Sequence, residues 1–190
     1  MEGIFLQIQE GDSADIADFE FDVEDADANI DRIDVSFEGG TSEDDPWETF
    51  DNVAILLDGK VIAEEDTDDE DVWSNDEDVI ATAADDYHIR FSNIDEVIKE
   101  GETAELTVRV TAADGIDDLP ASWIVGFGDQ AIRVTDGEDT DTYFGDDADT
   151  VSFDVEEAGQ GEELTISEND DNLEGNTLQI ESDTSSDWEE

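Results

Sequence analysis

Residues 50–64 read FDNVAILLDGKVIAE and carry the strongest structural signal in the chain. Two apolar runs lie on either side of Asp58-Gly59, a dipeptide typical of two-residue β-hairpin turns. Glycine adopts the positive φ that such a turn requires, and aspartate tolerates it better than most residues. The stretch therefore predicts a β-hairpin, and with it a folded β protein rather than a disordered acidic chain.

The composition is extremely acidic. The 190 residues include 61 Asp and Glu against 6 Lys and Arg, which gives a formal net charge of -55. Charge of this density is typical of disorder when apolar residues are scarce, but here 36% of the residues are hydrophobic and nine are phenylalanines. We therefore expect a folded chain with a carboxylated surface, whose self-repulsion molar salt or bound divalent cations would screen.

The same composition excludes several classes of partner and chemistry. Nucleic acid and anionic membrane surfaces require clustered Lys or Arg, and none cluster in the sequence. No apolar run approaches the roughly 20 residues of a membrane-spanning helix, and the acidic start Met1-Glu2-Gly3 does not resemble a signal peptide. The absence of cysteine excludes disulfides, thiolate zinc sites and thiol catalysis.

Alternation of apolar and acidic residues predicts further short strands around the hairpin. They are residues 4–9, 16–23 (with a bulge near Ala17-Asp18), 30–37, 87–91, 104–110, 122–127, 131–135, 151–155, 164–167 and 177–181. Helical periodicity is not sustained anywhere, and residues 94–98 suggest only a short turn within the connector 94–101. The pattern predicts an all-β fold, an antiparallel Ig-like β-sandwich with long acidic loops, and a barrel is the alternative.

One internal similarity bears on domain organisation. Residues 6–16, LQIQEGDSADI, resemble residues 178–188, LQIESDTSSDW. Such an internal similarity is expected if the chain is one unit of a tandem array of repeats. We therefore predict an Ig-like module over residues 1–167, which could itself consist of two parts, followed by an acidic linker and the start of a further repeat over residues 168–190.

The order of these signals resembles a known family. An (I/F)xFxV strand, the hairpin with Asp58-Gly59-Lys60, and GETAELTVRV at residues 101–110 are similar to Ig-like repeats of large prokaryotic surface proteins, such as S-layer, stalk and adhesin proteins. The resemblance covers residues 16–110. The resemblance implies an extracellular structural protein, and the family has no fixed catalytic residues.

The acidic loops contain the candidate metal ligands. Calcium accepts six to eight oxygen atoms, and carboxylates at alternate positions can supply them. An EF-hand is excluded because Ile30 and Ser36 stand where that loop requires Gly and Glu. The alternative is a solvated surface adapted to high salt. The candidate calcium ligands are Asp25, Asp27, Asn29, Asp31, Asp66, Asp68, Asp136, Asp139, Asp141, Asp146, Asp147, Asp149, Glu168, Asp170 and Asp171.

Catalysis has little support in the sequence. His88, the only histidine, is expected on an exposed strand face beside Arg90, so a Ser-His triad is not expected. Close pairs of carboxylates arise by chance among 61 acidic residues and indicate nothing about hydrolysis. We expect the arginines within strands to pair with carboxylates on neighbouring strands, and Trp47, Trp73 and Trp123 to anchor the core or loops. The chain is predicted not to be an enzyme.

Together these observations favour a non-enzymatic structural or adhesive module of an extracellular surface protein or assembly, stabilised by calcium or salt. Its partners would be neighbouring copies or subunits that pair with edge strands near residues 4–9 and 177–181. Two alternatives remain. One is a virion coat, decoration or tail protein of a salt-adapted host, and the other is a carbohydrate-binding adhesin domain that contacts a glycan through its tryptophans.

Overall fold

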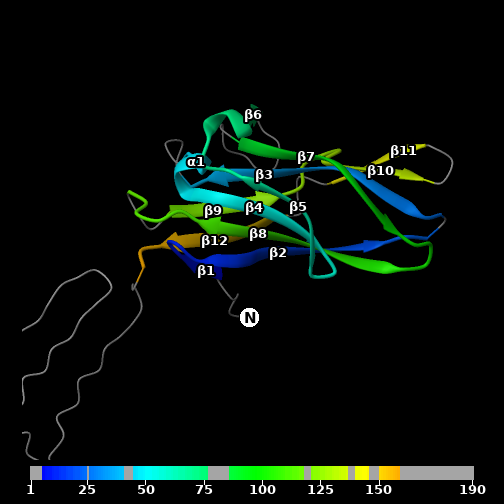
Figure 1. Cartoon of the computed structure of the whole chain (residues 1–190), viewed down its shortest axis with the longest axis horizontal. Coiled ribbons are helices and arrows are strands. Elements are labelled where there is room, and N and C mark those ends of the chain that lie inside the picture. The colour runs from blue at the N-terminus through cyan, green and yellow to red at the C-terminus, as the bar shows by residue number, and fades with distance from the viewer. Residues whose placement is uncertain are drawn as a thin grey trace, which may run out of the picture. The chain divides into compact units, whose positions relative to one another are not determined.

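Two β-sheets pack face to face in the computed structural model (Figure 1), which describes residues 6–24, 26–40, 45–76, 86–117, 121–136, 140–145 and 150–158. The larger sheet has the order β1 (Leu6–Gln9), β12 (Thr150–Glu156), β9 (Ala121–Gly126), β3 (Ala28–Gly39), β10 (Ile132–Asp136) and β11 (Asp141–Phe144). β7 (Asp86–Ile98) also pairs with β3, and β6 (Ser74–Asp76) pairs with β7. The fold is all-β, as predicted.

The smaller sheet has the order β2 (Ser13–Asp22), β8 (Thr103–Ala112), β4 (Phe50–Leu57) and β5 (Lys60–Asp66). Its pairs are all antiparallel, whereas in the larger sheet β1 runs parallel to β12. A short helix, α1 (Pro46–Thr49), leads into β4, and a 3-10 turn (Glu70–Val72) precedes β6. The described strands all lie within one compact unit, residues 1–160, and the predicted boundary at residue 167 stays a prediction.

The predicted hairpin forms as the sequence indicates. Asp58 and Gly59 have φ of 50° and 76°, and they join β4 to β5. The Asp58 carboxylate also accepts a hydrogen bond from the Glu105 N–H, at 3.0 Å. The turn is therefore tied to the adjacent strand β8 as well as to its own two strands.

Apolar side chains from both sheets form one core between them. Alternation places Ile33, Val35 and Phe37 of β3 in it, all completely buried. Phe50 lies at its centre, with its ring 5.0 Å from that of Trp123. The tryptophan prediction is confirmed for Trp73 and Trp123, which are buried, and the Trp73 indole N–H donates to the Thr67 carbonyl oxygen at 2.9 Å.

Several local predictions were wrong. Residues 94–98 do not form a separate turn, because β7 continues as a strand to Ile98. Positive φ at Asn93 and Asp95 and a register shift opposite Ile30 mark a bulge that keeps β7 paired with β3. No strand was predicted between residues 64 and 87, yet this acidic segment includes the end of β5 and the whole of β6, a short strand that sequence alternation did not reveal.

The environment of His88 also differs from the prediction. Its side chain is 8% exposed rather than on an open face, because it lies on β7 between β3 and β6, opposite Ser36 and Ser74. The bulge predicted near Ala17-Asp18 is present, between Asp15 and Ala17. The edge position predicted for residues 4–9 is confirmed for β1. The strands predicted at 164–167 and 177–181, and the repeat over 178–188, lie outside the described residues.

Candidate functional site

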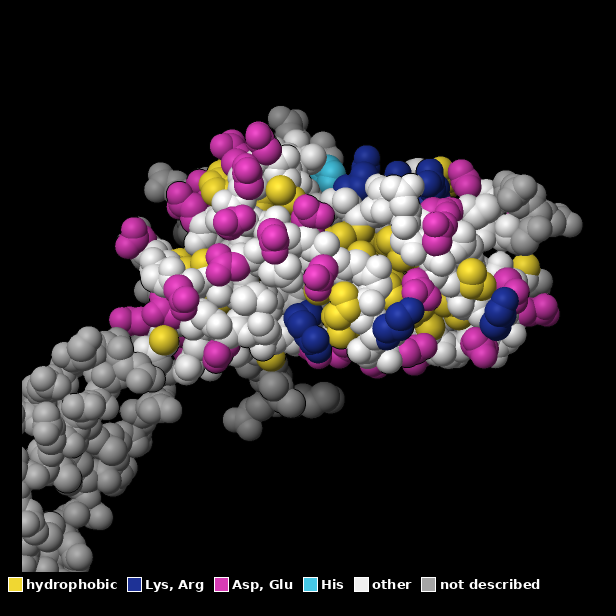
Figure 2. All heavy atoms as spheres, viewed as in Figure 1, with side chains coloured by type: hydrophobic (Ala, Val, Ile, Leu, Met, Phe, Trp, Pro, Cys, Tyr) yellow, Lys and Arg dark blue, Asp and Glu magenta, His cyan; other side chains and the backbone are white. Residues whose placement is uncertain are grey.

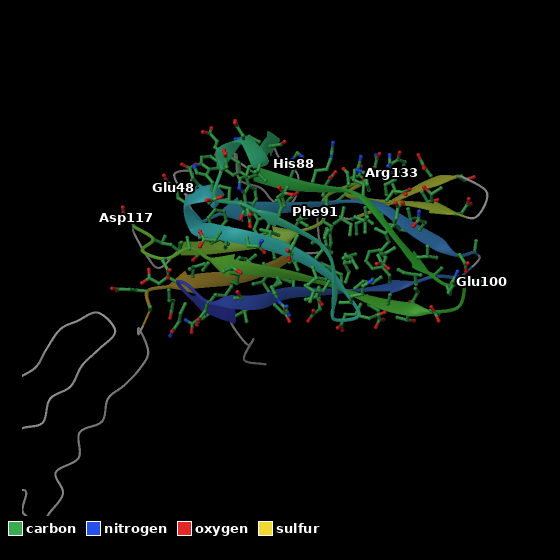
Figure 3. The ribbon with its side chains drawn as sticks, viewed as in Figure 1. Glu48, His88, Phe91, Glu100, Asp117 and Arg133 are labelled. Atoms are coloured by element: carbon green, nitrogen blue, oxygen red, sulfur yellow. The ribbon has the colours of Figure 1, made fainter. Side chains whose placement is uncertain are left out.

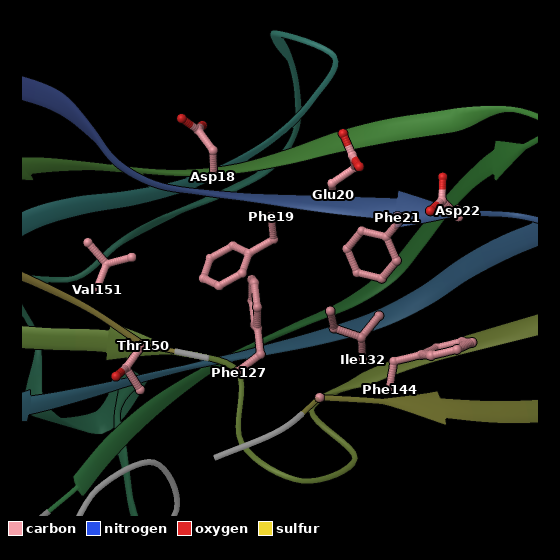
Figure 4. A pocket seen from close by; sticks show the side chains of 11 residues that line it. Asp18, Phe19, Glu20, Phe21, Asp22, Phe127, Ile132, Phe144, Thr150 and Val151 are labelled. Carbon is pink, nitrogen blue, oxygen red and sulfur yellow. The ribbon is translucent and has the colours of Figure 1, made fainter. Parts of the chain in front are cut away.

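A groove opens between the two sheets beside β2, the outermost strand of the smaller sheet. It has a volume of about 610 Å³. Figure 4 shows Phe19 and Phe21 pointing from β2 toward Phe127, Ile132 and Phe144 of the larger sheet. The other lining residues are Thr150 and Val151 at the start of β12, Gly145, and the acidic residues of β2, which are Asp18, Glu20 and Asp22.

Aromatic rings line the groove in edge-to-face pairs. The Phe19 and Phe127 ring centroids lie 4.4 Å apart, and those of Phe21 and Phe144 lie 6.4 Å apart. Phe127 is buried, Phe19 and Phe21 are half-buried, and Phe144 is 45% exposed. Beside it, Gly145 has a φ of 130° and approaches the Gly128 carbonyl so closely that any side chain would collide with it. The rim is therefore fixed by packing as well as by strand pairing.

The opposite face of β2 is acidic. Asp18, Glu20 and Asp22 point away from the rings in Figure 4. Asp18 and Asp22 accept hydrogen bonds from the hydroxyls of Thr107 and Thr103, both at 2.7 Å, across the pair with β8. Among the described residues, no strand pairs with β2 on its other side. The groove thus lies beside a ten-residue edge strand whose outer backbone groups pair with no described strand.

The predicted calcium ligands that the structure describes are mostly engaged within the protein. Asp27 accepts hydrogen bonds from Lys99 Nζ, at 2.7 Å, and from the Glu100 N–H, at 3.0 Å. The Lys99 bond, supported by the Glu100 N–H, lowers the pKa of the Asp27 carboxyl. Asp66 lies at the end of β5 and accepts a bond from Asn52 at 3.4 Å.

Two of the predicted acidic clusters meet where β3, β10 and β11 lie side by side. The Thr135 hydroxyl contacts the carboxylates of both Asp31 and Asp141, the latter at 3.2 Å. Asn29 lies opposite Thr135 in the strand register, and its side-chain amide donates to Asp31 at 3.3 Å. The Asp136 carboxylate accepts a hydrogen bond from the Thr140 N–H at 2.9 Å.

The calcium prediction itself is not tested by these contacts. Within the described ranges, no group of three or more His, Asp or Glu side chains is arranged to hold a metal ion. Asp68 is described and exposed, two residues beyond the end of β5. The other candidates lie outside the described residues: Asp25, Asp139, Asp146, Asp147, Asp149, Glu168, Asp170 and Asp171.

Arginine–carboxylate pairs cross between strands as predicted, with one exception. Arg109 binds Asp15 through two hydrogen bonds, at 2.5 and 3.0 Å, and Arg90 binds Asp34 in the same fork at 2.7 and 2.8 Å. Arg133 lies 4.0 Å from Asp31. Arg32 instead approaches Asp34 of its own strand, because residues two apart share one face of a strand.

The pKa of the Asp51 carboxyl is shifted upward in the folded chain. Desolvation by burial, followed by the nearby charges of Asp68 and Asp114, raises the pKa of the Asp51 carboxyl. A raised pKa means that ionisation costs more in the folded chain than in the unfolded chain, so it lowers stability as the pH rises above the ordinary carboxyl value.

Replacing Asp51 with asparagine is therefore expected to raise the midpoint of thermal unfolding at neutral pH and low salt. The gain is small because solvent screens this mostly exposed side chain. At about pH 3, where the carboxyl is protonated in both states, variant and parent should unfold together. If the thermal midpoints of variant and parent differed equally at both pH values, the stabilisation would not come from removing the ionised carboxylate.

Comparisons with known proteins leave the function open. No protein-family model matches the chain, and no curated protein sequence matches it. A solved structure described as "AvmM Catalyzes Macrocyclization in Alchivemycin A Biosynthesis" is similar over 81% of this chain and 85% of that chain, with 11% identity and a TM-score of 0.43. ACE19, the collagen binding subdomain of the Enterococcus faecalis surface protein ACE, is similar over 79% and 93%, with 10% identity and a TM-score of 0.26. These two likenesses are too distant to support an argument about function.

Proposed function

We propose that this chain is a non-enzymatic binding module of an extracellular surface protein or assembly. Its groove would take an extended segment of a partner protein as an added strand along β2. The observation that carries the proposal is the coincidence of an unpaired edge strand with an aromatic groove at the same place. Main-chain hydrogen bonds to such an edge supply affinity, and pockets for alternate side chains supply specificity.

The side chains of β2 define the chemistry of the partner segment. Every second residue, Phe19 and Phe21, faces the groove, so the segment would present apolar side chains at alternate positions. The residues between them are acidic, and cross-strand pairs of opposite charge are favourable whereas like charges repel. A segment that alternates apolar residues with Lys or Arg complements both faces. A second copy of this acidic chain complements the charge poorly.

Figure 2 supports the same view of the surface, because Asp and Glu side chains are spread over the face that it shows. An array of such modules would repel others of its kind in dilute salt and attract basic partners. No helix among the described residues is long and apolar enough to span a membrane. Surface location and stabilisation by calcium remain parts of the proposal rather than findings.

The tryptophans that the carbohydrate alternative invoked do not form an exposed aromatic surface. Trp73 and Trp123 are buried in the core, and Trp47 packs edge-to-face on Tyr87 with ring centroids 5.3 Å apart. A sugar would need an exposed aromatic face to stack on, and these three rings are already packed against the protein. We therefore do not propose glycan binding through the tryptophans. No structural observation favours the virion alternative.

The proposal is tested with a synthetic peptide that alternates apolar residues with lysine and matches β2 in length. Titration calorimetry with the full chain in about 0.5 M salt suppresses non-specific attraction, because the Debye length is then only a few ångströms. We expect saturable binding by the alternating peptide. A peptide of the same composition with its lysines in one block should bind at least about tenfold more weakly, because it cannot fill alternate positions.

Two matched variants locate the site. Phe144→Asp, at the groove rim, should weaken binding about tenfold, because it removes an apolar contact and brings a charge to that rim. Val61→Asp makes the same charge change at a similarly exposed residue, 42% against 45%, on the edge strand β5. It should leave the affinity within about twofold. Equal effects of the two substitutions, or no binding of the alternating peptide, would reject the proposal.

A further inference from the structure

Basic side chains gather on one face of this acidic molecule. Arg32, Arg90 and Arg133 come from the adjacent strands β3, β7 and β10, and they are three of only 6 Lys and Arg residues in the chain. Arg32 and Arg133 are direct cross-strand neighbours, an arrangement that repels unless anions lie nearby. Figure 2 shows basic side chains beside the single histidine, and Figure 3 labels His88 and Arg133 on the same side of the larger sheet.

A pocket of about 330 Å³ lies on this face. Arg32, Asp34 and Ser36 of β3 line it, together with His88 and Arg90 of β7 and the loop 129–131. The loop is held against β3 by a hydrogen bond from the Asp34 N–H to the Ala131 carbonyl oxygen, at 2.8 Å. The pocket is thus built from two paired strands and a fixed loop.

The Ser36 hydroxyl in this pocket has no hydrogen-bond partner among the described residues. The side chain is only 1% exposed, and leaving a buried hydroxyl without a partner is unfavourable. Buried polar groups in folded proteins nearly always have a partner, so an exception requires an explanation. A ligand that accepts a hydrogen bond in the pocket provides one.

The Arg32 guanidinium also retains donor capacity. Its Nη2 donates to the Gln130 carbonyl oxygen at 2.8 Å, and its Nε lies 3.3 Å from Asp34 without forming a hydrogen bond. A guanidinium carries five N–H donors in a plane that matches a carboxylate. Both oxygens of Asp34 already accept from Arg90. A second carboxylate, that of Asp129, also lines the pocket and accepts a hydrogen bond from the Gln130 side-chain amide at 3.3 Å. Even with both carboxylates present, the Ser36 hydroxyl and the Arg32 Nε–H make no hydrogen bond among the described residues.

We propose that this pocket binds a carboxylate, which accepts hydrogen bonds from the Arg32 guanidinium and the Ser36 hydroxyl. The carboxylate could belong to a free small molecule or to an Asp or Glu side chain of a second copy of this chain. The site is separate from the groove beside β2 and does not depend on the function proposed for that groove.

His88 makes the proposal directly measurable, because it is the only histidine and lies in the pocket. Its imidazole resonances can be followed by NMR in the full chain while sodium acetate replaces sodium chloride at a constant 1 M sodium, about the concentration at which the Debye length falls to ~3 Å. We expect a saturable change of the His88 resonances. No change, or a change that does not saturate, would overturn the proposal.

Three variants separate binding from general electrostatics. Arg32→Gln and Ser36→Ala should each weaken acetate binding about tenfold, since each removes a hydrogen bond to a charged ligand. Arg109→Gln removes a guanidinium on the other sheet, where it pairs with the Asp15 carboxylate, and should change the affinity less than about twofold. Ser36→Ala should also keep or raise the thermal midpoint without acetate, because it removes an unpartnered hydroxyl. Equal weakening by all three variants would overturn the proposal.

A dilution series without acetate distinguishes the two sources of the carboxylate. If a second copy supplies it, the His88 resonances of the parent chain depend on protein concentration, and those of Arg32→Gln do not. If the ligand is a free carboxylate, dilution has no effect and acetate alone shifts the resonances.

Discussion

Replacing Phe50 with alanine is expected to lower the free energy of unfolding by about 3–5 kcal/mol. The Phe50 side chain is completely buried at the start of β4. Its ring centroid lies 5.0 Å from that of Trp123, 5.4 Å from Phe37 and 6.0 Å from Phe153, so it joins the smaller sheet to three strands of the larger one. Truncation removes these contacts and leaves a cavity that close-packed neighbours fill only in part.

The measurement is denaturant unfolding in molar KCl, where charge repulsion is screened, with the slope against denaturant compared between variants. Phe144→Ala is the matched control, because it makes the same truncation at a ring that is 45% exposed. It should cost less than about 1 kcal/mol. If Phe144→Ala lowered the free energy of unfolding as much as Phe50→Ala, the position assigned to the core would be contradicted.

Transfer from molar KCl to low salt is expected to lower the midpoint of thermal unfolding by about 10 °C or more. The net charge of -55 makes the compact state repel itself. The Debye length rises from about 3 Å at 1 M to about 30 Å at 0.01 M, so carboxylates that are independent in molar salt interact across the whole surface in dilute salt.

A third buffer, with low salt and millimolar calcium, tests the metal prediction. We expect calcium to raise the midpoint above the value in sodium chloride of the same ionic strength, because an ion that binds the folded state alone stabilises it by mass action. A calcium midpoint equal to that of the matched sodium chloride would show that the acidic loops are solvated surface. If the midpoint of thermal unfolding were the same in all three buffers, the carboxylates would not repel one another on the surface of the folded chain, and the account would be contradicted.

The parts of the fold that the sequence predicted depend on local patterns. The turn at Asp58-Gly59 requires only two residues of the right conformation, and alternation within β2, β3 and β8 shows which side chains face the core. Sheet order is different, because it depends on pairs such as β3 with β10, whose members lie about a hundred residues apart in the chain. The parallel pair of β1 with β12 and the short strands β6 and β11 have no local signal of their own.

The groove was not predicted, for a related reason. Phe19 and Phe21 alternate like core residues, and the sequence does not show that β2 lies at an edge with the sheets parted beside it. The burial of His88 likewise depends on β6, which the alternation pattern missed. Oxygen-rich loops identified candidate calcium ligands by residue type, but type alone did not reveal that Lys99 and Thr135 bind Asp27 and Asp31.

The most direct test of the proposed strand addition is amide hydrogen exchange of the full chain with and without the alternating peptide. The β2 amides that do not bond to β8 should exchange quickly in the free chain, because nothing pairs with them among the described residues. We predict that the peptide protects these amides and leaves the outer edge of β5 unchanged. Peptide binding that leaves the exchange of the β2 edge amides unaltered would contradict the account.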